Sequence, residues 1–311
     1  MSENTPKAVS GEYQMLTRRK FNGATEDKLF LAIVYIVLLL LFAVIILPLL
    51  HIVSASMSDA DYVMRGQITF YPQHLSFIAY DTILENNSLV LGFLNSVFYT
   101  VAGTFVQVVT TILIAYPLSR RHFYGKDAIT GIVLLTMFFS GGLIPTFLMV
   151  KSLGLIDSRW AMILPGAMAG FQVLVARTFF QTAIPEELVE AAELDGASQI
   201  AIFARIVLPL STPIIAVLIV IYAVGNWNSF FDAMIYLNST YLFPLQIVLR
   251  NILIMNKPMP QYDPVKMMLQ LRMSALLKYA LIVVSSVPIL LFYPLIQKYF
   301  VKGLTVGSLK G

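Results

Sequence analysis

The sequence predicts an all-α, polytopic membrane protein with six transmembrane helices, on the evidence of its composition and its charge-free stretches. Of its 311 residues, 58% are hydrophobic and only 12% are charged, and the mean hydropathy is +0.78. Ordinary soluble domains do not have this composition. A helix needs roughly 20 apolar residues to cross about 30 Å of hydrocarbon. Six charge-free stretches meet or approach this length, and with their flanks they predict spans over 29–53, 87–119, 127–150, 158–180, 206–231 and 277–300 of a transmembrane domain, 29–301.

The first and fourth spans need separate justification. Residues 1–28 are polar and of mixed charge, and they predict a cytoplasmic lead-in whose Arg18-Arg19-Lys20 cluster favours an inside location. This basic region and the apolar run after it are both too long for a cleaved signal peptide, so we expect the first span to stay. The fourth span is the shortest, and Arg177 near its end can extend to the interface.

Between the fourth and fifth spans lies a charged, amphipathic segment, 185–205, which predicts a helix-turn-helix outside the membrane. Pro185 and the two glutamates after it indicate a helix start, because proline lacks only an N–H that the first turn leaves unpaired, and acids favour the positive end of the helix dipole. Asp195-Gly196 is typical of a helix end, and Ser198 can cap a second helix.

A seventh charge-free run, Ala233 to Leu249, is better explained as part of an external loop, 238–272, than as a span. Polar residues and Pro244 interrupt it. The sixth span and a glycine-containing cytoplasmic tail, 302–311, follow. With six spans and both termini in the cytoplasm, thirteen of the 21 basic residues fall inside and eight outside, in agreement with the positive-inside rule.

Missing residue types exclude several functions. The chain has no cysteine, and its three histidines, His51, His74 and His122, are not spaced as metal ligands, so we expect no thiol chemistry and no metal site. The span interiors hold no ionisable residue, which argues against catalytic residues and against proton-coupled transport. Lys151-Ser152 follows a valine where a phosphate-binding loop needs glycine. Driven transport would therefore need a separate ATPase.

The helix-turn-helix segment contains a pattern of fixed spacing. Glu190-Ala191-Ala192 is followed after three residues by Gly196, and after nine more by Ile206 to Pro209. The pattern resembles the EAA motif of binding-protein-dependent ABC importer permeases. This resemblance implies a coupling helix pair that docks into an ATP-binding subunit, with polar contacts from Glu190, close packing at the alanines and the turn at Gly196. The alternative is an ordinary interfacial helix pair. The implied interface comprises Glu190, Ala191, Ala192, Asp195, Gly196, Ile206, Leu208 and Pro209.

Other stretches narrow the resemblance to carbohydrate, or maltose-type, permeases, in the branch typified by the LplC and YtcP proteins. They are GQITFYP at 66–72, Asn95-Ser96, AYPLSR at 115–120, FFSGGLIP at 138–145, LGLIDSRW at 153–160 and the tail, 303–311. The resemblance implies the type I ABC importer permease fold and the import of an oligosaccharide or other glycan by alternating access. It places the chain, with membrane lipid around it, in the bacterial cytoplasmic (inner) membrane.

The same resemblance implies partners. They are a second, different permease subunit, two ATP-binding subunits that hold ATP and Mg, and an extracellular or periplasmic solute-binding protein. The chain itself is expected to bind no cofactor and no nucleic acid. The tail either reaches into the ATPase dimer interface or is a solvated end.

Polar and aromatic residues at the end of the fifth span are the candidate substrate pathway. Aromatic faces stack on sugar rings, and amides hydrogen-bond to hydroxyls without a net charge. Alternatively, the amides bridge helices and Trp227 anchors at the external interface. The candidates are Asn226, Trp227, Asn228, Ser229, Phe230, Asp232 and Tyr236.

The external loop contains a proline-stiffened stretch whose position resembles that of the loop by which maltose-type permeases contact the binding protein. A connector packed on its own subunit is the alternative. The candidates are Lys257, Pro258, Gln261, Tyr262 and Asp263. Two other functions stay open: a permease for another neutral polar solute, such as a glycerophosphodiester or polyol, and a non-transporting membrane sensor that docks an ATPase and needs no polar pathway.

Overall fold

The computed structural model describes residues 25–252, 268 and 272–291, which are mostly helical; their only β-structure is an isolated bridge between Ser58 and Leu75. The helices in chain order are α1 (Thr25–Ser56), α2 (Ala60–Met64), α3 (Ile78–Glu85), α4 (Asn87–Ser119), α5 (Lys126–Phe138), α6 (Leu143–Ser152), α7 (Trp160–Ile163), α8 (Gly170–Ala183), α9 (Glu186–Leu194), α10 (Gln199–Ile202), the π-helix η1 (Phe203–Val207), α11 (Leu208–Leu210), α12 (Thr212–Trp227), α13 (Phe231–Tyr236), the 3-10 helix η2 (Thr240–Leu242), α14 (Leu245–Arg250) and a last helix, Arg272–Leu291.

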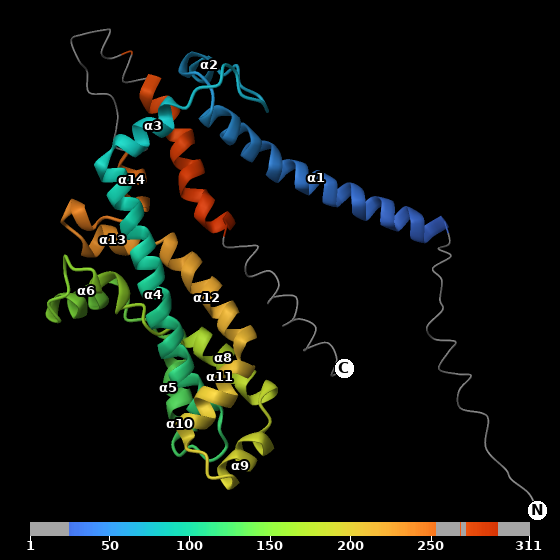
Figure 1. Ribbon diagram of the computed structural model, residues 1–311, viewed down its shortest axis with the longest axis vertical. Coiled ribbons are helices and arrows are strands. Elements are labelled where there is room, and N and C mark those ends of the chain that lie inside the picture. The colour runs from blue at the N-terminus through green and yellow to red at the C-terminus, as the bar shows by residue number, and fades with distance from the viewer. Residues whose placement is uncertain (1–24, 253–267, 269–271, 292–311) are drawn as a thin grey trace, which may run out of the picture.

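Helix α4 is the centre of the fold and runs along most of the long axis of the molecule (Figure 1). Helices α3, α5, α7, α8, α12 and α14 all pack against it. At one end its buried residues join α8, α12 and the helix-turn-helix in a core that includes Ile112, Leu118, Phe180 and Ile202. At the other end Leu89 joins Trp227, Leu245 and Leu281 in a second core. A single long helix therefore connects both ends of the molecule.

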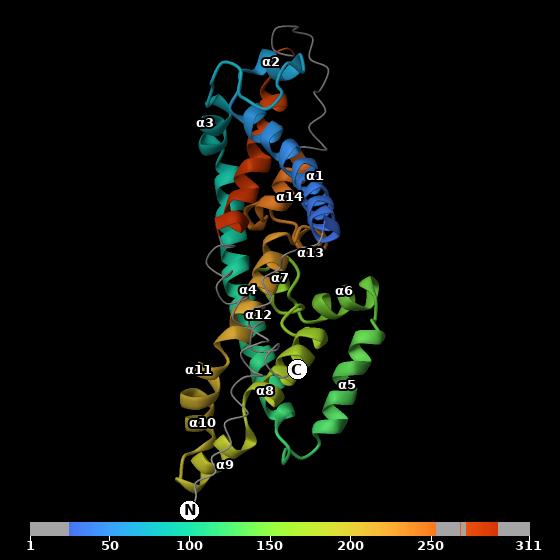
Figure 2. The same ribbon diagram turned by 90° about the vertical axis from the view of Figure 1, so that its right-hand side faces the viewer.

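Helix α1 stands apart from this bundle. In Figure 1 it leaves the region of α2 and α3 and extends away from the other helices, and in Figure 2 this direction faces the viewer. Its most apolar window, within Lys28–Ser56, has no buried residue, although its mean hydropathy of 3.4 is higher than the 1.8 of α4. Of the three described helices that could each cross a membrane alone, the most apolar is thus the one whose apolar window is least buried.

By length and composition, three described helices could cross a membrane alone: Lys28–Ser56, Asn87–Ser119 and Arg272–Leu291. The count is five if each of two bent helix pairs is one span. The sequence predicts one span over 127–150, whereas the structure has α5 and α6 there, bent by 118°. Gly142 explains the break, because its φ of 82° and ψ of 177° belong to a backbone region that is almost restricted to glycine.

The predicted fourth and fifth spans are also interrupted. Between α7 and α8 the chain is non-helical around Pro165 and Gly166, since proline removes a backbone donor and disfavours helix for the residue before it. The predicted span 206–231 begins within Gln199–Leu210, which is bent by 75° relative to α12. The rejected run, 233–249, folds into parts of α13 and α14 with η2 between them, all too short to cross a bilayer.

Candidate functional site

The helix-turn-helix lies at the end of the molecule farthest from α2 (Figures 1 and 2). Helix α9 starts after Pro185 and stops before Asp195. Gly196 has a φ of +79°, which L-residues with a side chain rarely adopt, so it makes the turn. The Ser198 hydroxyl then accepts a hydrogen bond from the Ala201 N–H at 3.3 Å and caps α10.

The motif residues of this segment face in two directions. Ala192, Ile206 and Leu208 are partly buried and pack against the core shared with α4 and α8. The others are exposed to solvent; they are Glu190, Ala191, Asp195, Gly196 and Pro209. The motif therefore contributes both to anchoring the helix pair and to its outer surface.

Two apolar side chains at the tip of the helix pair are almost fully exposed. Leu194 is 90% exposed and Ile200 is 81% exposed, one on each side of the Gly196 turn. Sequence reasoning missed both, because it weighed only the motif positions. A leucine directly before the acidic residue and glycine of a turn was the available signal.

Arg120, just after α4, ties the helix pair to the bundle. Its Nη2 donates a hydrogen bond to the Phe180 carbonyl at 3.2 Å, and its Nη1 lies 4.0 Å from the Glu186 carboxylate at the start of α9. The guanidinium also lies 5.1 Å from the centre of the Tyr116 ring. The end of α4 is thereby joined to α8 and α9 through one side chain.

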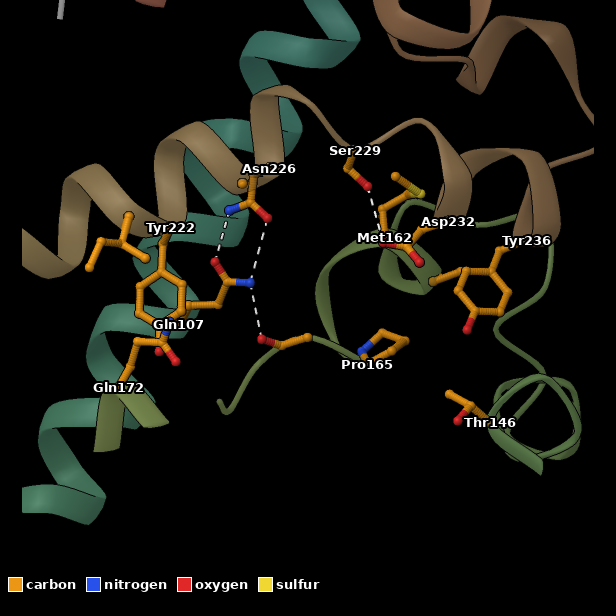
Figure 3. A pocket seen from close by; sticks show the side chains of 14 residues that line it. Gln107, Thr146, Met162, Pro165, Gln172, Tyr222, Asn226, Ser229, Asp232 and Tyr236 are labelled. Atoms are coloured by element: carbon orange, nitrogen blue, oxygen red, sulfur yellow. Dashed lines mark hydrogen bonds between the residues drawn. The ribbon is translucent and has the colours of Figure 1, made fainter. Parts of the chain in front are cut away.

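A cavity of about 510 Å³ lies near the middle of the fold, between α4, α12, α13 and the segment that joins α7 to α8 (Figure 3). Four of the predicted pathway residues line it: Asn226, Ser229, Asp232 and Tyr236. Gln107 from α4 and Gln172 from α8 also line it, as do Thr146 and Tyr222. The lining is mostly neutral and combines amides and hydroxyls with aromatic and aliphatic surface.

A network of amides closes one side of this cavity (Figure 3). Asn226 Nδ2 donates to Gln107 Oε1 at 2.8 Å and to Thr104 Oγ1 at 3.2 Å. Gln107 Nε2 donates in turn to the Gly166 carbonyl at 3.0 Å. Asn226 can approach this closely because Gly103 has no Cβ; one built there would lie 2.9 Å from Asn226 Nδ2. The network connects α4, α12 and the non-helical segment between α7 and α8.

Three of the predicted pathway residues do not line this cavity. Trp227 is buried away from the cavity lining, where its Nε1 donates to the Ser285 carbonyl at 3.0 Å and its ring meets Phe93 edge-on. Asn228 bonds within its own helix, to the Val224 carbonyl at 2.8 Å. Phe230 is 42% exposed and does not line the cavity. A helix turns about 100° per residue, so consecutive side chains cannot all face one cavity.

The Asn226 side chain both bridges α4 and α12 and lines the cavity, so its position fits either sequence interpretation. The missed lining residues Gln107 and Gln172 had a usable signal. Each is an amide within a charge-free predicted span, where polar side chains usually face the protein interior. Their shared position appears only when α4 and α8 are placed in space.

Asp157 fixes the segment that follows the cavity residue Tyr236. Its carboxylate accepts hydrogen bonds from the Asn238 N–H at 2.9 Å, from the Ser239 N–H at 2.8 Å and from the Ser239 hydroxyl at 2.5 Å. These bonds, with the hydroxyl contributing most, lower the pKa of Asp157 below its usual value. Burial, and then the nearby Asp232 carboxylate, raise the pKa of Tyr236.

Several predicted features lie outside the described residues: the candidate contact loop from Lys257 to Asp263, most of the lead-in 1–28, and the tail 302–311. Within the described part of the chain, no group of three or more histidine or acidic residues could hold a metal ion.

The sequence was compared with protein families and with known proteins. No family model matches the sequence. The chain is 42% identical over 287 residues to the polygalacturonan/rhamnogalacturonan transport system permease protein YtcP of Bacillus subtilis, covering 92% of this chain and 100% of that protein. It is 40% identical over 269 residues to the protein LplC of the same organism, covering 86% and 90%.

Among solved structures, the chain resembles part of a bacterial ABC transporter involved in the import of the acidic polysaccharide alginate. The TM-score is 0.82 at 28% identity, and the match covers 89% of this chain and 99% of that one. The apolar helices of the present chain fit a polytopic membrane protein. Extensive identity to transporter permeases and a shared helical fold lead to one conclusion: the chain belongs to the carbohydrate, or maltose-type, family of ABC importer permease subunits, in the branch of YtcP and LplC.

Proposed function

We propose that this chain translocates an oligosaccharide or other glycan into the cytoplasm, as one permease subunit of a binding-protein-dependent importer. The observation that carries the proposal is the cavity between α4, α12 and α13. Its amides and hydroxyls suit sugar hydroxyls, which donate and accept hydrogen bonds, and the Tyr236 ring, parallel to Phe147 with centroids 6.4 Å apart, offers an aromatic surface for sugar rings. The roles of the relatives in carbohydrate transport support it.

The helix-turn-helix is proposed as the site where ATP hydrolysis in partner subunits is coupled to transport. Leu194 and Ile200 present apolar surface that a partner's cleft would cover, and burying each such side chain contributes roughly 1.5–3 kcal/mol. Glu190 and Asp195 beside them supply polar contacts. Motion of this tip would reach α4 through Arg120 and α9.

Alternating access is the proposed transport mechanism, and one helix supports it. Helix α4 contacts the coupling end through Arg120 and the cavity through Gln107, so displacement of the tip changes the helix packing around the cavity. In this proposal ATP and Mg bind to two ATPase subunits and a second permease subunit completes the pathway. Both termini are cytoplasmic, and an external binding protein delivers the substrate to the stretch from Lys257 to Asp263.

The first experiment measures ATPase activity of the chain co-purified with its partners in nanodiscs, with the binding protein either empty or loaded from a panel of oligosaccharides. We expect one loaded form to stimulate hydrolysis and to be taken up by proteoliposomes. Stimulation only by a different neutral solute would replace the sugar with that solute. A stable ATPase complex that no loaded binding protein stimulates would favour the sensor function.

Gly196→Pro tests the coupling role. Proline requires a φ near −65°, which is incompatible with the +79° of Gly196, so the turn between α9 and α10 would deform. We expect insertion into the membrane to persist while substrate-stimulated ATPase activity and uptake are lost. Gly154→Pro, at a turn after α6 with a φ of +67°, is the matched control for a deformed turn away from the tip. Wild-type uptake by Gly196→Pro would overturn the coupling assignment.

A further inference from the structure

The charge of the cavity is unbalanced. Asp232 is the one carboxylate among its lining residues, and none of the described lining residues is lysine, arginine or histidine. Arg159, close in sequence to the lining residues Ala161 and Met162, lies over the Phe98 ring instead, at 4.7 Å from its centre. A solute in this cavity therefore meets a negative charge without a facing cation from the described part of this chain.

Asp232 is placed to contact a solute directly. It lies in the first turn of α13, and its side chain is exposed on the cavity wall opposite the amide network (Figure 3). The Ser229 hydroxyl donates a hydrogen bond to its Oδ2 at 3.1 Å, which orients the carboxylate. No described residue donates a hydrogen bond to Oδ1, so this oxygen is available to hydroxyl groups of a sugar.

We infer that Asp232 determines charge specificity, favouring uncharged sugars over carboxylated ones on this chain's side of the pathway. The inference rests on the proposed function. A carboxylate accepts hydrogen bonds from neighbouring sugar hydroxyls, and these charge-assisted bonds are stronger than neutral ones. A sugar carboxylate at the same place would instead face a like charge in a partly enclosed site, where repulsion is stronger than in bulk water. Cations that would accept an acidic glycan must then come from elsewhere in the complex.

The similarity to the alginate transporter makes the inference specific. That protein takes part in importing an acidic polysaccharide with a fold close to this one, so the fold itself does not exclude an acidic substrate. Charge preference must depend on individual side chains in the pathway. Among the described lining residues, Asp232 is the one that carries a charge, so its replacement by a neutral residue removes that charge from the cavity.

The test compares pentagalacturonate with its fully methyl-esterified form, which lacks the negative charges and carries a methyl group on each carboxyl; comparing variants with the same two probes isolates the effect of charge. Binding of each radiolabelled probe to the complete complex in nanodiscs is measured by equilibrium dialysis at low and high salt. In the wild type we expect the neutral ester to bind more tightly than the acid. Asp232→Asn should shift the ratio of the two dissociation constants toward the acid by about tenfold at low salt, and by less at high salt, because salt screens charge repulsion.

Two further variants make the result decisive. Asp232→Glu keeps the charge and should keep the wild-type ratio. Asp81→Asn makes the same charge change on an exposed face of α3, outside the cavity lining, and should leave the ratio unchanged. An unchanged ratio in Asp232→Asn, or a shift of the ratio toward the ester, would overturn the inference and leave the proposed function standing. Failure of the wild-type complex to take up any glycan in the uptake experiment would overturn both.

Discussion

Helices α1 and α4 have almost the same length, 32 and 33 residues, but opposite positions in the fold. The more apolar helix, α1, has no buried residue in its most hydrophobic window, whereas 44% of the corresponding window of α4 is buried. Apolarity alone therefore does not bring a helix into the centre of this protein. In a membrane, lipid solvates leucine as well as another helix does, so hydrophobicity supplies little preference for protein contact.

The composition of α4 explains its central position. Its buried face includes small and polar residues, and these make hydrogen bonds to other segments. Asn95 Nδ2 donates to the Tyr241 carbonyl at 2.8 Å, the Tyr99 hydroxyl donates to the Leu242 carbonyl at 2.9 Å, and Ser96 Oγ accepts from the Leu245 N–H at 2.8 Å. Helix α1, by contrast, consists mainly of leucine, isoleucine and valine. Small and polar residues thus mark the helix that organises the bundle.

We expect the largest difference between α1 and α4 when the same substitution, leucine to alanine, is made in each and the free energy of unfolding is compared. Leu118→Ala in α4 removes a side chain that is 1% exposed within the core, and leaves a cavity; we expect a loss of about 2–5 kcal/mol in the free energy of unfolding. Leu40→Ala in α1 removes a side chain that is 58% exposed, and we expect a change within about 0.5 kcal/mol. Unfolding of the purified chain in mixed micelles measures both. Equal losses would contradict the contrast between α1 and α4.

A second test adds volume rather than removing it. Gly103→Val in α4 places its Cβ 2.9 Å from Asn226 Nδ2, so the Asn226 side chain must leave its place between α4 and α12, at a cost of about 1–3 kcal/mol. Gly131→Val in α5 makes the same change where no atom lies within 4 Å, so it controls for helix propensity. Comparable stability of the two variants, measured in the same micelles, would show that the close approach of α4 and α12 is not required.

The sequence predicts the bounds of α4 better than those of other spans, for local reasons. The Asn86 side chain caps its start by accepting from the Ser88 and Leu89 N–H groups, and Arg120 marks its end. The break between α5 and α6 was missed, because a charge-free run hides a glycine such as Gly142 whose backbone leaves the helical region. Hydropathy averaged over a window does not register a single such residue.

The candidate site was predictable only where one segment supplies it. The helix-turn-helix depends on local signals at Pro185, Gly196 and Ser198, and the structure has a helix start, a turn and a cap there. The cavity combines residues that are far apart in the chain, such as Gln107 and Asn226, so their pairing could not be read from either segment. Trp227 does not line the cavity beside Asn226, since sequence adjacency does not indicate which side of a helix a residue occupies.

A smaller effect is expected from breaking the polar contact between α4 and α12. Gln107→Leu and Asn226→Leu each remove one partner of the 2.8 Å hydrogen bond, and each leaves the other amide partly unsatisfied. A double-mutant cycle in mixed micelles should give a coupling free energy of about 0.6–1.7 kcal/mol, the range found for hydrogen bonds between transmembrane helices. Additive losses would mean that small residues, and not amides, hold α4 in the centre.

We expect the smallest effect on stability from Asp157, which supports α4 indirectly by holding a segment that contacts it. Asp157 holds Asn238 and Ser239, just before the carbonyls of 241–243 that accept from α4. Because its hydrogen bonds lower the pKa of Asp157, their contribution is present above its ordinary value of 3.8 and is lost as the pH falls through the lower value in the folded chain. The thermal midpoint of Asp157→Asn should therefore lie below that of the wild type at pH 7, and the gap should shrink as the pH falls below 3.8.

Asp81→Asn supplies the comparison for this measurement, because Asp81 is an exposed acid on α3 and should show no such closing gap. A gap for Asp157→Asn that is the same at neutral and acidic pH would show that its charge does not hold the segment. The segment would then depend on α4 alone, through Asn95 and Tyr99, which would strengthen the contrast with α1. A gap that closes on acidification would instead show that a helix becomes central partly through loop contacts that fix its hydrogen-bond acceptors in place.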